Sequence, residues 1–287
     1  MPRRLPAGAE EELRALGAKS RRIAGERVEL HLLDYGGAGM PLLVLPGITS
    51  PAITWDFVVA HLRDLVRPIV LDLRGRGLST AGGSYAVEDF AVDVETVVRS
   101  LVVERPLLLG HSLGGRIAAA VAARIEVPIA GTIVIDPPLS GPDRGAYPTP
   151  REAFVEQLHE AQAGTTADEV ARHYLRWPRS ELLLRARWLP SCDKAAVLAT
   201  YDWFEREDFF DWWPHVRPPA AFIRGEESPV VTAEGAREAA EANPSAAQRA
   251  VPAAGHMVPW DNFTGFMTEI RSLLVTLFET VTAAVAG

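Results

Sequence analysis

The pentapeptide at residues 110–114, Gly-His-Ser-Leu-Gly, constrains this 287-residue chain more than any other segment. An apolar run, Leu107–Leu109, precedes it, and an alanine-rich segment follows it. Glycine on both sides of Ser112 lets the backbone turn sharply from a strand into a helix, which holds the serine side chain exposed beside the N-terminus of that helix. The pattern therefore predicts a strand–turn–helix unit that presents Ser112 as a nucleophile.

Short apolar runs typical of strands alternate with helix-like segments along most of the chain. Since helices such as Ser84–Leu101 and Leu113–Arg124 separate the later strands, we expect these strands to be parallel and joined by crossover connections. The two earliest strands are close enough in sequence to form a hairpin. The predicted strands are Arg27–Asp34, Leu42–Leu45, Ile69–Leu73, Leu107–Leu109, Gly131–Asp136, Ala220–Arg224 and Ala247–Val251.

This alternation breaks at a pair of prolines, Pro137 and Pro138. The sequence that follows is first rich in Pro and Gly, then helical in character and rich in Trp and Arg, until the strand pattern resumes at Ala220. We interpret it as a helical cap inserted over the carboxyl ends of the strands, with a set of ordinary packing helices as the alternative. The predicted organisation is a first core part at 1–138, a cap at 139–216 and a second core part at 217–287.

Composition excludes several classes of protein. The formal net charge of −8 argues against a nucleic-acid or anionic-membrane partner, and the single cysteine, Cys192, cannot form an internal disulfide. Residues Leu5–Ala24 are charged and lack the apolar core of an export signal, and no apolar run reaches the ~20 residues that span a bilayer. We expect a cytoplasmic protein with a small-molecule substrate. We expect neither a metal nor another cofactor, since the sequence has no ligand cluster and no phosphate loop.

Four short elements, in this order, resemble the α/β-hydrolase fold family. They are Leu45–Ile48, Asp72–Ser79, Gly110–Gly114 and the pair Gly255-His256. The resemblance extends from Val28 to about Phe278. It implies an α/β-hydrolase fold, in which a mostly parallel central sheet is flanked by helices and carries the helical cap as an insertion.

The resemblance also assigns roles around the nucleophile. It implies that His256 is the general base for Ser112 and that the backbone N–H groups of Ile48 and Leu113 form an oxyanion hole. Chemistry requires the base independently, because a neutral serine hydroxyl is a poor nucleophile until its proton is removed. Among the seven histidines, His256 is the best candidate; for His111, beside the nucleophile, we expect local packing.

The third member of such a triad is an acid, and here the chain departs from the commonest family pattern. Many relatives carry Asp at the fourth position of a turn after the next-to-last strand, where this chain has Ser228. A minority carry it at the end of the strand that follows the nucleophile helix, where this chain has Asp136. We therefore predict that Asp136 orients His256, with Glu227 as the alternative acid.

Substrate predictions come from the segment after Asp136. Residues 136–142, followed by Arg144 and Tyr147, resemble the family of cofactor-independent amidohydrolases that cleave (E)-2-(acetamidomethylene)succinate. This implies hydrolysis of the amide C–N bond of a small carboxylated substrate, and we predict that Arg144, Arg176 and Arg179 bind its carboxylates. Open alternatives are a carboxylesterase, lactonase or thioesterase, a C–C bond hydrolase or cofactor-free haloperoxidase, and a non-catalytic ligand receptor. A homodimer also remains open.

Overall fold

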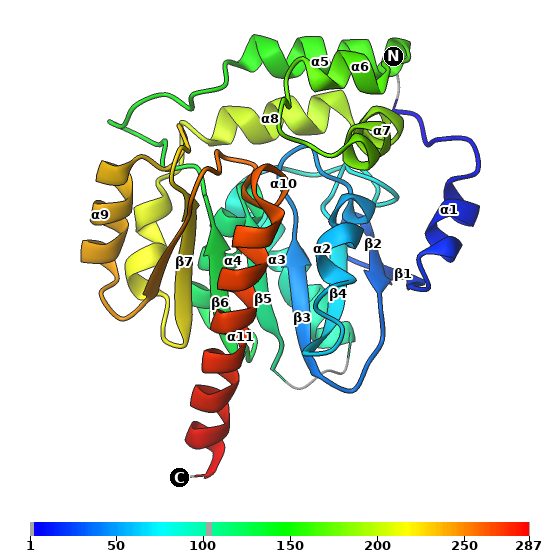
Figure 1. Ribbon diagram of the computed structural model, residues 1–287. Coiled ribbons are helices and arrows are strands. Elements are labelled where there is room, and N and C mark those ends of the chain that lie inside the picture. The colour runs from blue at the N-terminus through cyan, green and yellow to red at the C-terminus, as the bar shows by residue number, and fades with distance from the viewer. Residues whose placement is uncertain (1–2, 102–104, 287) are drawn as a thin grey trace.

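The architecture is built on an eight-stranded sheet. The computed structural model describes residues 3–101 and 105–286, and within them the strand order is β1-β2-β4-β3-β5-β6-β7-β8 (Figure 1). The first two neighbouring pairs, β1 with β2 and β2 with β4, are antiparallel, and all later pairs are parallel. The strands are β1 Lys19–Ala24, β2 Glu29–Asp34, β3 Met40–Leu45, β4 Val66–Asp72, β5 Leu107–His111, β6 Gly131–Ile135, β7 Ala220–Gly225 and β8 Ala247–Val251.

The parallel arrangement of the later strands is confirmed, but the predicted hairpin between the segments at 27–34 and 42–45 is wrong. Strand β2 forms its hairpin with β1, and β4 inserts between β2 and β3. Sequence reasoning missed β1 because it is an edge strand with a single buried side chain, Ile23, and therefore lacks an apolar run.

Two layers of helices cover the sheet because its central strands are apolar on both sides. In β3, Leu43 and Leu45 belong to one apolar cluster while Leu42 and Val44 belong to the other, as the period of two requires. Figure 1 shows a helix layer on each face. One layer contains α3 Val87–Ser100, α4 Leu113–Arg124 and α9 Ala233–Ala242, and the other contains α1 Ala9–Ala15, α2 Asp56–Val59, α10 Val258–Asp261 and α11 Phe263–Ala286.

The chain between β6 and β7 leaves the sheet and forms a helical segment beside the carboxyl ends of the parallel strands. Figure 1 shows these helices across the top of the sheet, at the edge where β5 passes into α4. They are α5 Arg151–Ala163, α6 Ala167–Ala171, α7 Arg179–Trp188 and α8 Lys194–Trp203. Short 3-10 turns cover Ala52–Trp55, Leu189–Ser191, Phe209–Asp211 and Trp213–His215. No helix within the described ranges has both the length and the apolar character needed to cross a membrane.

Candidate active site

Ser112 occupies the sharp turn between β5 and α4. Its backbone has φ 55° and ψ −120°, a conformation that a residue with a Cβ rarely adopts. Both flanking glycines are required by close backbone approach: a Cβ on Gly114 would lie 1.8 Å from the carbonyl oxygen of Leu45, and one on Gly110 would lie 2.0 Å from that of Gly114. The predicted strand–turn–helix unit is therefore present, and the packing around it admits no residue larger than glycine at positions 110 and 114.

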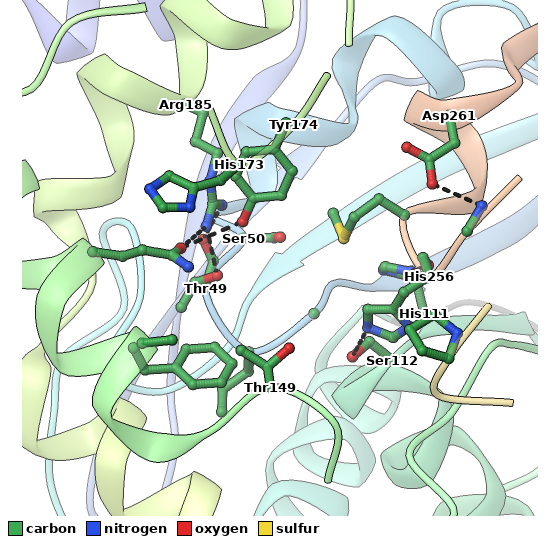
Figure 2. Close-up of a pocket in the computed structure, with 18 of the residues that line it drawn as sticks. Thr49, Ser50, His111, Ser112, Thr149, His173, Tyr174, Arg185, His256 and Asp261 are labelled. Carbon is green, nitrogen blue, oxygen red and sulfur yellow. Dashed lines mark hydrogen bonds between the residues drawn. The ribbon is translucent and has the colours of Figure 1, made fainter. Parts of the chain in front are cut away.

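His256 lies between Ser112 and Asp136 and is hydrogen-bonded to both. Its Nε2 is 3.0 Å from the Ser112 hydroxyl, and its Nδ1 is 2.8 Å from Oδ2 of Asp136. Figure 2 shows the ring of His256 directed at Ser112 along the first of these hydrogen bonds. The structure thus brings together the three predicted side chains, although Asp136 and His256 lie 24 and 144 residues after Ser112 in the sequence.

Asp136 follows the last residue of β6 and is fully buried, with φ 45°. Besides His256, it accepts hydrogen bonds from the Gly225 N–H at 3.1 Å and the Ser228 hydroxyl at 2.5 Å. Burial raises the pKa of Asp136 above its ordinary value, while the hydrogen bonds from His256 and Ser228 oppose that rise. Ser228, at the position where many relatives carry the acid, therefore supports the carboxylate from the neighbouring strand.

Glu227, the alternative acid, is engaged elsewhere. Its carboxylate forms an ion pair with Arg176 at 2.5 Å, and about half of its side chain is exposed. No hydrogen bond or ion pair joins it to His256 in the part of the chain that the structure describes. The geometry therefore favours Asp136 over Glu227 as the partner of the imidazole.

Two backbone N–H groups, those of Ile48 and Leu113, are the predicted oxyanion hole. Ile48 follows β3, and Leu113 is the first residue of α4, next to Ser112. Neither N–H donates to a backbone acceptor within residues 3–101 and 105–286. The buried Arg76 donates to the Ile48 carbonyl at 2.9 Å, which holds the next peptide unit of this loop, Ile48–Thr49.

Two further residues contact His256, and sequence reasoning assigned neither of them to the site. His111 Nε2 donates to the His256 carbonyl oxygen at 2.9 Å, and burial lowers the pKa of His111 to about 3, so its ring stays neutral. The Tyr147 hydroxyl lies 3.4 Å from His256 Nε2, and burial raises its pKa, so it stays protonated. The only signal in the sequence was their proximity to Ser112 and to Asp136.

A cavity of about 520 Å³ opens above Ser112 and has walls from both the sheet and the helical segment. Among the residues that the structure describes, 3–101 and 105–286, no cluster of His, Cys, Asp or Glu side chains could hold a metal ion. The wall on the side of the sheet is formed by strand ends, the loops that follow them and α10, and it includes Gly47, Ile48, Thr49, Ser50, His111, Ser112, Glu227, Gly255, His256 and Asp261. The wall from the helical segment includes Tyr147, Thr149, Phe154, Gln157, His173, Tyr174, Arg176 and Arg185.

The three arginines predicted to bind substrate lie in different places. Arg144 pairs with Asp208 and Glu238 and does not line the cavity. Arg179 is exposed, pairs with an aspartate and also lies outside the cavity. Only Arg176 lines it, and its guanidinium already pairs with Glu227. The positions of Arg144 and Arg179 therefore do not support the prediction that they bind the substrate.

The defining sequence pattern of the alpha/beta hydrolase family matches residues 42–266, and the chain belongs to this family. N-formylmaleamate deformylase from Pseudomonas putida is 35% identical over 254 residues, covering 88% of this chain and 95% of the relative. 2-(Acetamidomethylene)succinate hydrolase from Mesorhizobium japonicum is 27% identical over 251 residues, covering 83% of this chain and 89% of the relative. A crystal structure of N-formylmaleamic acid deformylase from a P. putida strain superposes with a TM-score of 0.83, covering 88% of this chain and all of that one at 34% identity. The protein is thus a hydrolase that acts on a small substrate.

Proposed function

We propose that this protein is a cofactor-independent serine hydrolase that cleaves the amide C–N bond of a small carboxylated substrate, with N-formylmaleamate as the first candidate. The observation that carries the proposal is the hydrogen-bonded row Ser112–His256–Asp136 at the base of the cavity. The similarity over 95% of N-formylmaleamate deformylase supports the choice of substrate.

In the proposed mechanism, His256 takes the hydroxyl proton as the Ser112 oxygen attacks the amide carbonyl carbon. The N–H groups of Ile48 and Leu113 bind the oxygen on which negative charge develops. His256 then gives the proton to the departing nitrogen, and the C–N bond breaks. This leaves an acyl ester on Ser112, which a water molecule activated by His256 hydrolyses to restore the enzyme.

Asp136 acts through the imidazole in this scheme. Its carboxylate accepts a hydrogen bond from the Nδ1–H of His256, which leaves Nε2 free to take the serine proton, and it stabilises the imidazolium that forms. Protonated Tyr147, 3.4 Å from Nε2, adds a donor beside the reacting atoms. With a formyl amide as substrate, the acyl group would be formyl, and the products would be formate and maleamate.

We also propose that residues 139–216 form a cap over this site. Side chains from this segment, including Tyr147, Phe154 and Arg185, line the cavity opposite the sheet. A wall of this kind excludes water from the reacting atoms and selects the substrate by its shape and charge.

A second candidate substrate is (E)-2-(acetamidomethylene)succinate. It is favoured by the motif after Asp136 and by the 27% identity over 89% of the hydrolase that bears this name. It contains the same type of bond, an amide whose nitrogen is attached to a conjugated carboxylated fragment. It would acylate Ser112 with acetyl instead of formyl.

The test is formate release from N-formylmaleamate by the wild-type protein beside Ser112→Ala. We expect turnover by the wild type and a loss of about 10⁴-fold or more in the variant, with an unchanged melting temperature. Acetate release from (E)-2-(acetamidomethylene)succinate ranks the second candidate in the same experiment. If neither amide is cleaved while p-nitrophenyl acetate is hydrolysed in a Ser112-dependent way, the amidase assignment is wrong and the esterase alternative replaces it.

A further inference from the structure

Arg185 is a buried cation in the wall of the cavity. It lies on α7, its residue is 4% exposed, and it lines the cavity together with Thr49 and Gln157. Its guanidinium donates only to uncharged oxygens: the Thr49 carbonyl at 3.3 Å, the Thr49 hydroxyl at 3.2 Å and Oε1 of Gln157 at 3.3 Å. These hydrogen bonds are long, and they leave the charge uncompensated.

No ion pair joins Arg185 to a carboxylate in the part of the chain that the structure describes. Several other arginines of the same segment each have an acidic partner. Those pairs are Arg144 with Asp208 and Glu238, Arg151 with Asp202, Arg176 with Glu227, Arg179 with Asp168, and Arg187 with Glu12. A buried charge without a counter-ion is destabilising unless something supplies the opposite charge, and here the cavity is the open side.

The planar guanidinium of Arg185 is held against an aromatic ring. The ring of Tyr174 lies under the guanidinium, with 4.8 Å between the Arg185 Cζ and the ring centroid. Figure 2 shows Arg185, His173, Tyr174 and Thr49 gathered on one side of the cavity, away from Ser112 and His256. Stacking on one face leaves the plane of the guanidinium to its hydrogen-bond partners, and a carboxylate that enters from the cavity can replace the long hydrogen bonds to Thr49 and Gln157 with charge-assisted ones.

The opposite side of the cavity is acidic. Glu227 and Asp261 line it near His256, and Asp261 accepts a hydrogen bond from the Gly255 N–H at 2.9 Å. Because Arg176 on that side is already paired with Glu227, a substrate carboxylate meets net negative charge there and an unpaired positive charge at Arg185. The charge distribution therefore orients a carboxylated amide with its acid group at Arg185 and its carbonyl at Ser112.

We propose that Arg185 is the subsite that binds the substrate carboxylate, and that it, rather than Arg144, Arg176 or Arg179, determines the preference for an acidic amide. This inference rests on the proposed function for the identity of the substrate. The unpaired charge that motivates it does not depend on catalysis. Binding can therefore test it separately.

The experiment measures binding to the inactive Ser112→Ala protein by calorimetry. The two probes are maleamate, which has one carboxylate, and maleamide, its uncharged diamide. We expect maleamate to bind roughly 10- to 100-fold more tightly, as a charge-assisted hydrogen-bonded pair provides. Adding Arg185→Gln should abolish that preference.

The matched control is Arg187→Gln, on the same helix and outside the cavity, which should keep the preference. Arg185→Lys retains the charge but loses the paired N–H groups, so its preference for maleamate over maleamide should be smaller than that of the Arg185 protein and larger than that of Arg185→Gln. If Arg185→Gln does not fold, Arg185→Lys decides alone.

The proposal is overturned if the Ser112→Ala protein does not distinguish the two probes, or if either Arg185 variant keeps the full preference. Failure of the proposed function looks different. In that case formate release is absent while the Arg185-dependent preference for maleamate remains.

Discussion

At the scale of single residues, the notable feature is the position of the acid: this chain carries Ser228 where many relatives carry the acid, and it has Asp136 on the neighbouring strand. The two residues follow neighbouring parallel strands, β7 and β6, so their side chains meet beyond the carboxyl ends of these strands. The Ser228 hydroxyl donates to the Asp136 carboxylate, which in turn holds His256.

We predict that Asp136→Asn lowers kcat by about 10³- to 10⁴-fold, because the amide favours the wrong imidazole tautomer and cannot stabilise the imidazolium. Glu227→Gln should change kcat less than about tenfold, since that carboxylate pairs with Arg176 instead of His256. Steady-state kinetics on N-formylmaleamate compares the two variants. The opposite ranking would move the acid to Glu227.

The sequence predicts the position of residues whose neighbours are set by the chain, and it does not predict where the arginine side chains lie. Ser112 and Asp136 each terminate a strand, so the fold class alone places them at one edge. An arginine has a long side chain, and whether it faces a cavity depends on carboxylates from remote segments. Arg144 meets Glu238, 94 residues away, and nothing in the local sequence indicates that pair.

At the scale of elements, the turn between β5 and α4 is defined by backbone contacts. Helix α4 starts so close to the end of β3 that Gly114 touches the Leu45 carbonyl. This explains why the glycine pattern predicted the element accurately: the predicted helix Leu113–Arg124 has the observed bounds. Strand β1 shows the opposite case, because an edge strand needs no apolar pattern and gives no signal.

We predict that Gly114→Ala destabilises the fold by about 3 kcal/mol or more, since its Cβ would collide with backbone that cannot move independently. Thermal melting measures the effect. The control is Gly145→Ala, in an exposed loop where an added Cβ meets nothing within 4 Å. Equal melting temperatures for the two variants would contradict the packing argument.

At the scale of the whole molecule, one carboxyl group links the helical segment to the sheet core. Glu207 accepts a hydrogen bond from the Val87 N–H at the start of α3, with an N···O distance of 3.0 Å, and its own carbonyl accepts one from the buried Arg116. Burial raises the pKa of Glu207 to about 8, and the neighbouring Glu88 adds to the rise. The group therefore keeps its proton in the folded state at pH values where the unfolded chain loses it.

The consequence for stability has a definite sign. Below about pH 4 the group is protonated in both states; as the pH rises from there towards 8 the unfolded chain binds fewer protons, so folding stability falls. Glu207→Gln keeps the acceptor oxygen and removes this penalty. We predict a melting temperature about 2 °C or more above wild type at pH 9 and little difference at pH 5.

Thermal melting at both pH values tests this prediction. Glu205→Gln, exposed two residues away, serves as the control and should show no pH-dependent gain. A gain for Glu207→Gln that is the same at pH 5 and pH 9 would rule out titration of this carboxyl group as the cause.

Ser112 and Asp136 share a property with consequences beyond catalysis: both have a backbone conformation, with φ of 55° and 45°, that glycine adopts without strain. Each such residue costs about 1–3 kcal/mol of stability. At Ser112, a library of variants selected for heat resistance alone would therefore favour glycine and lose the proposed nucleophile. Asp136 differs, because its carboxylate accepts hydrogen bonds from Gly225 and Ser228 that a glycine would leave unpaired. Directed evolution of this scaffold has to select for turnover at every round, because thermal tolerance and the proposed chemistry oppose each other at Ser112.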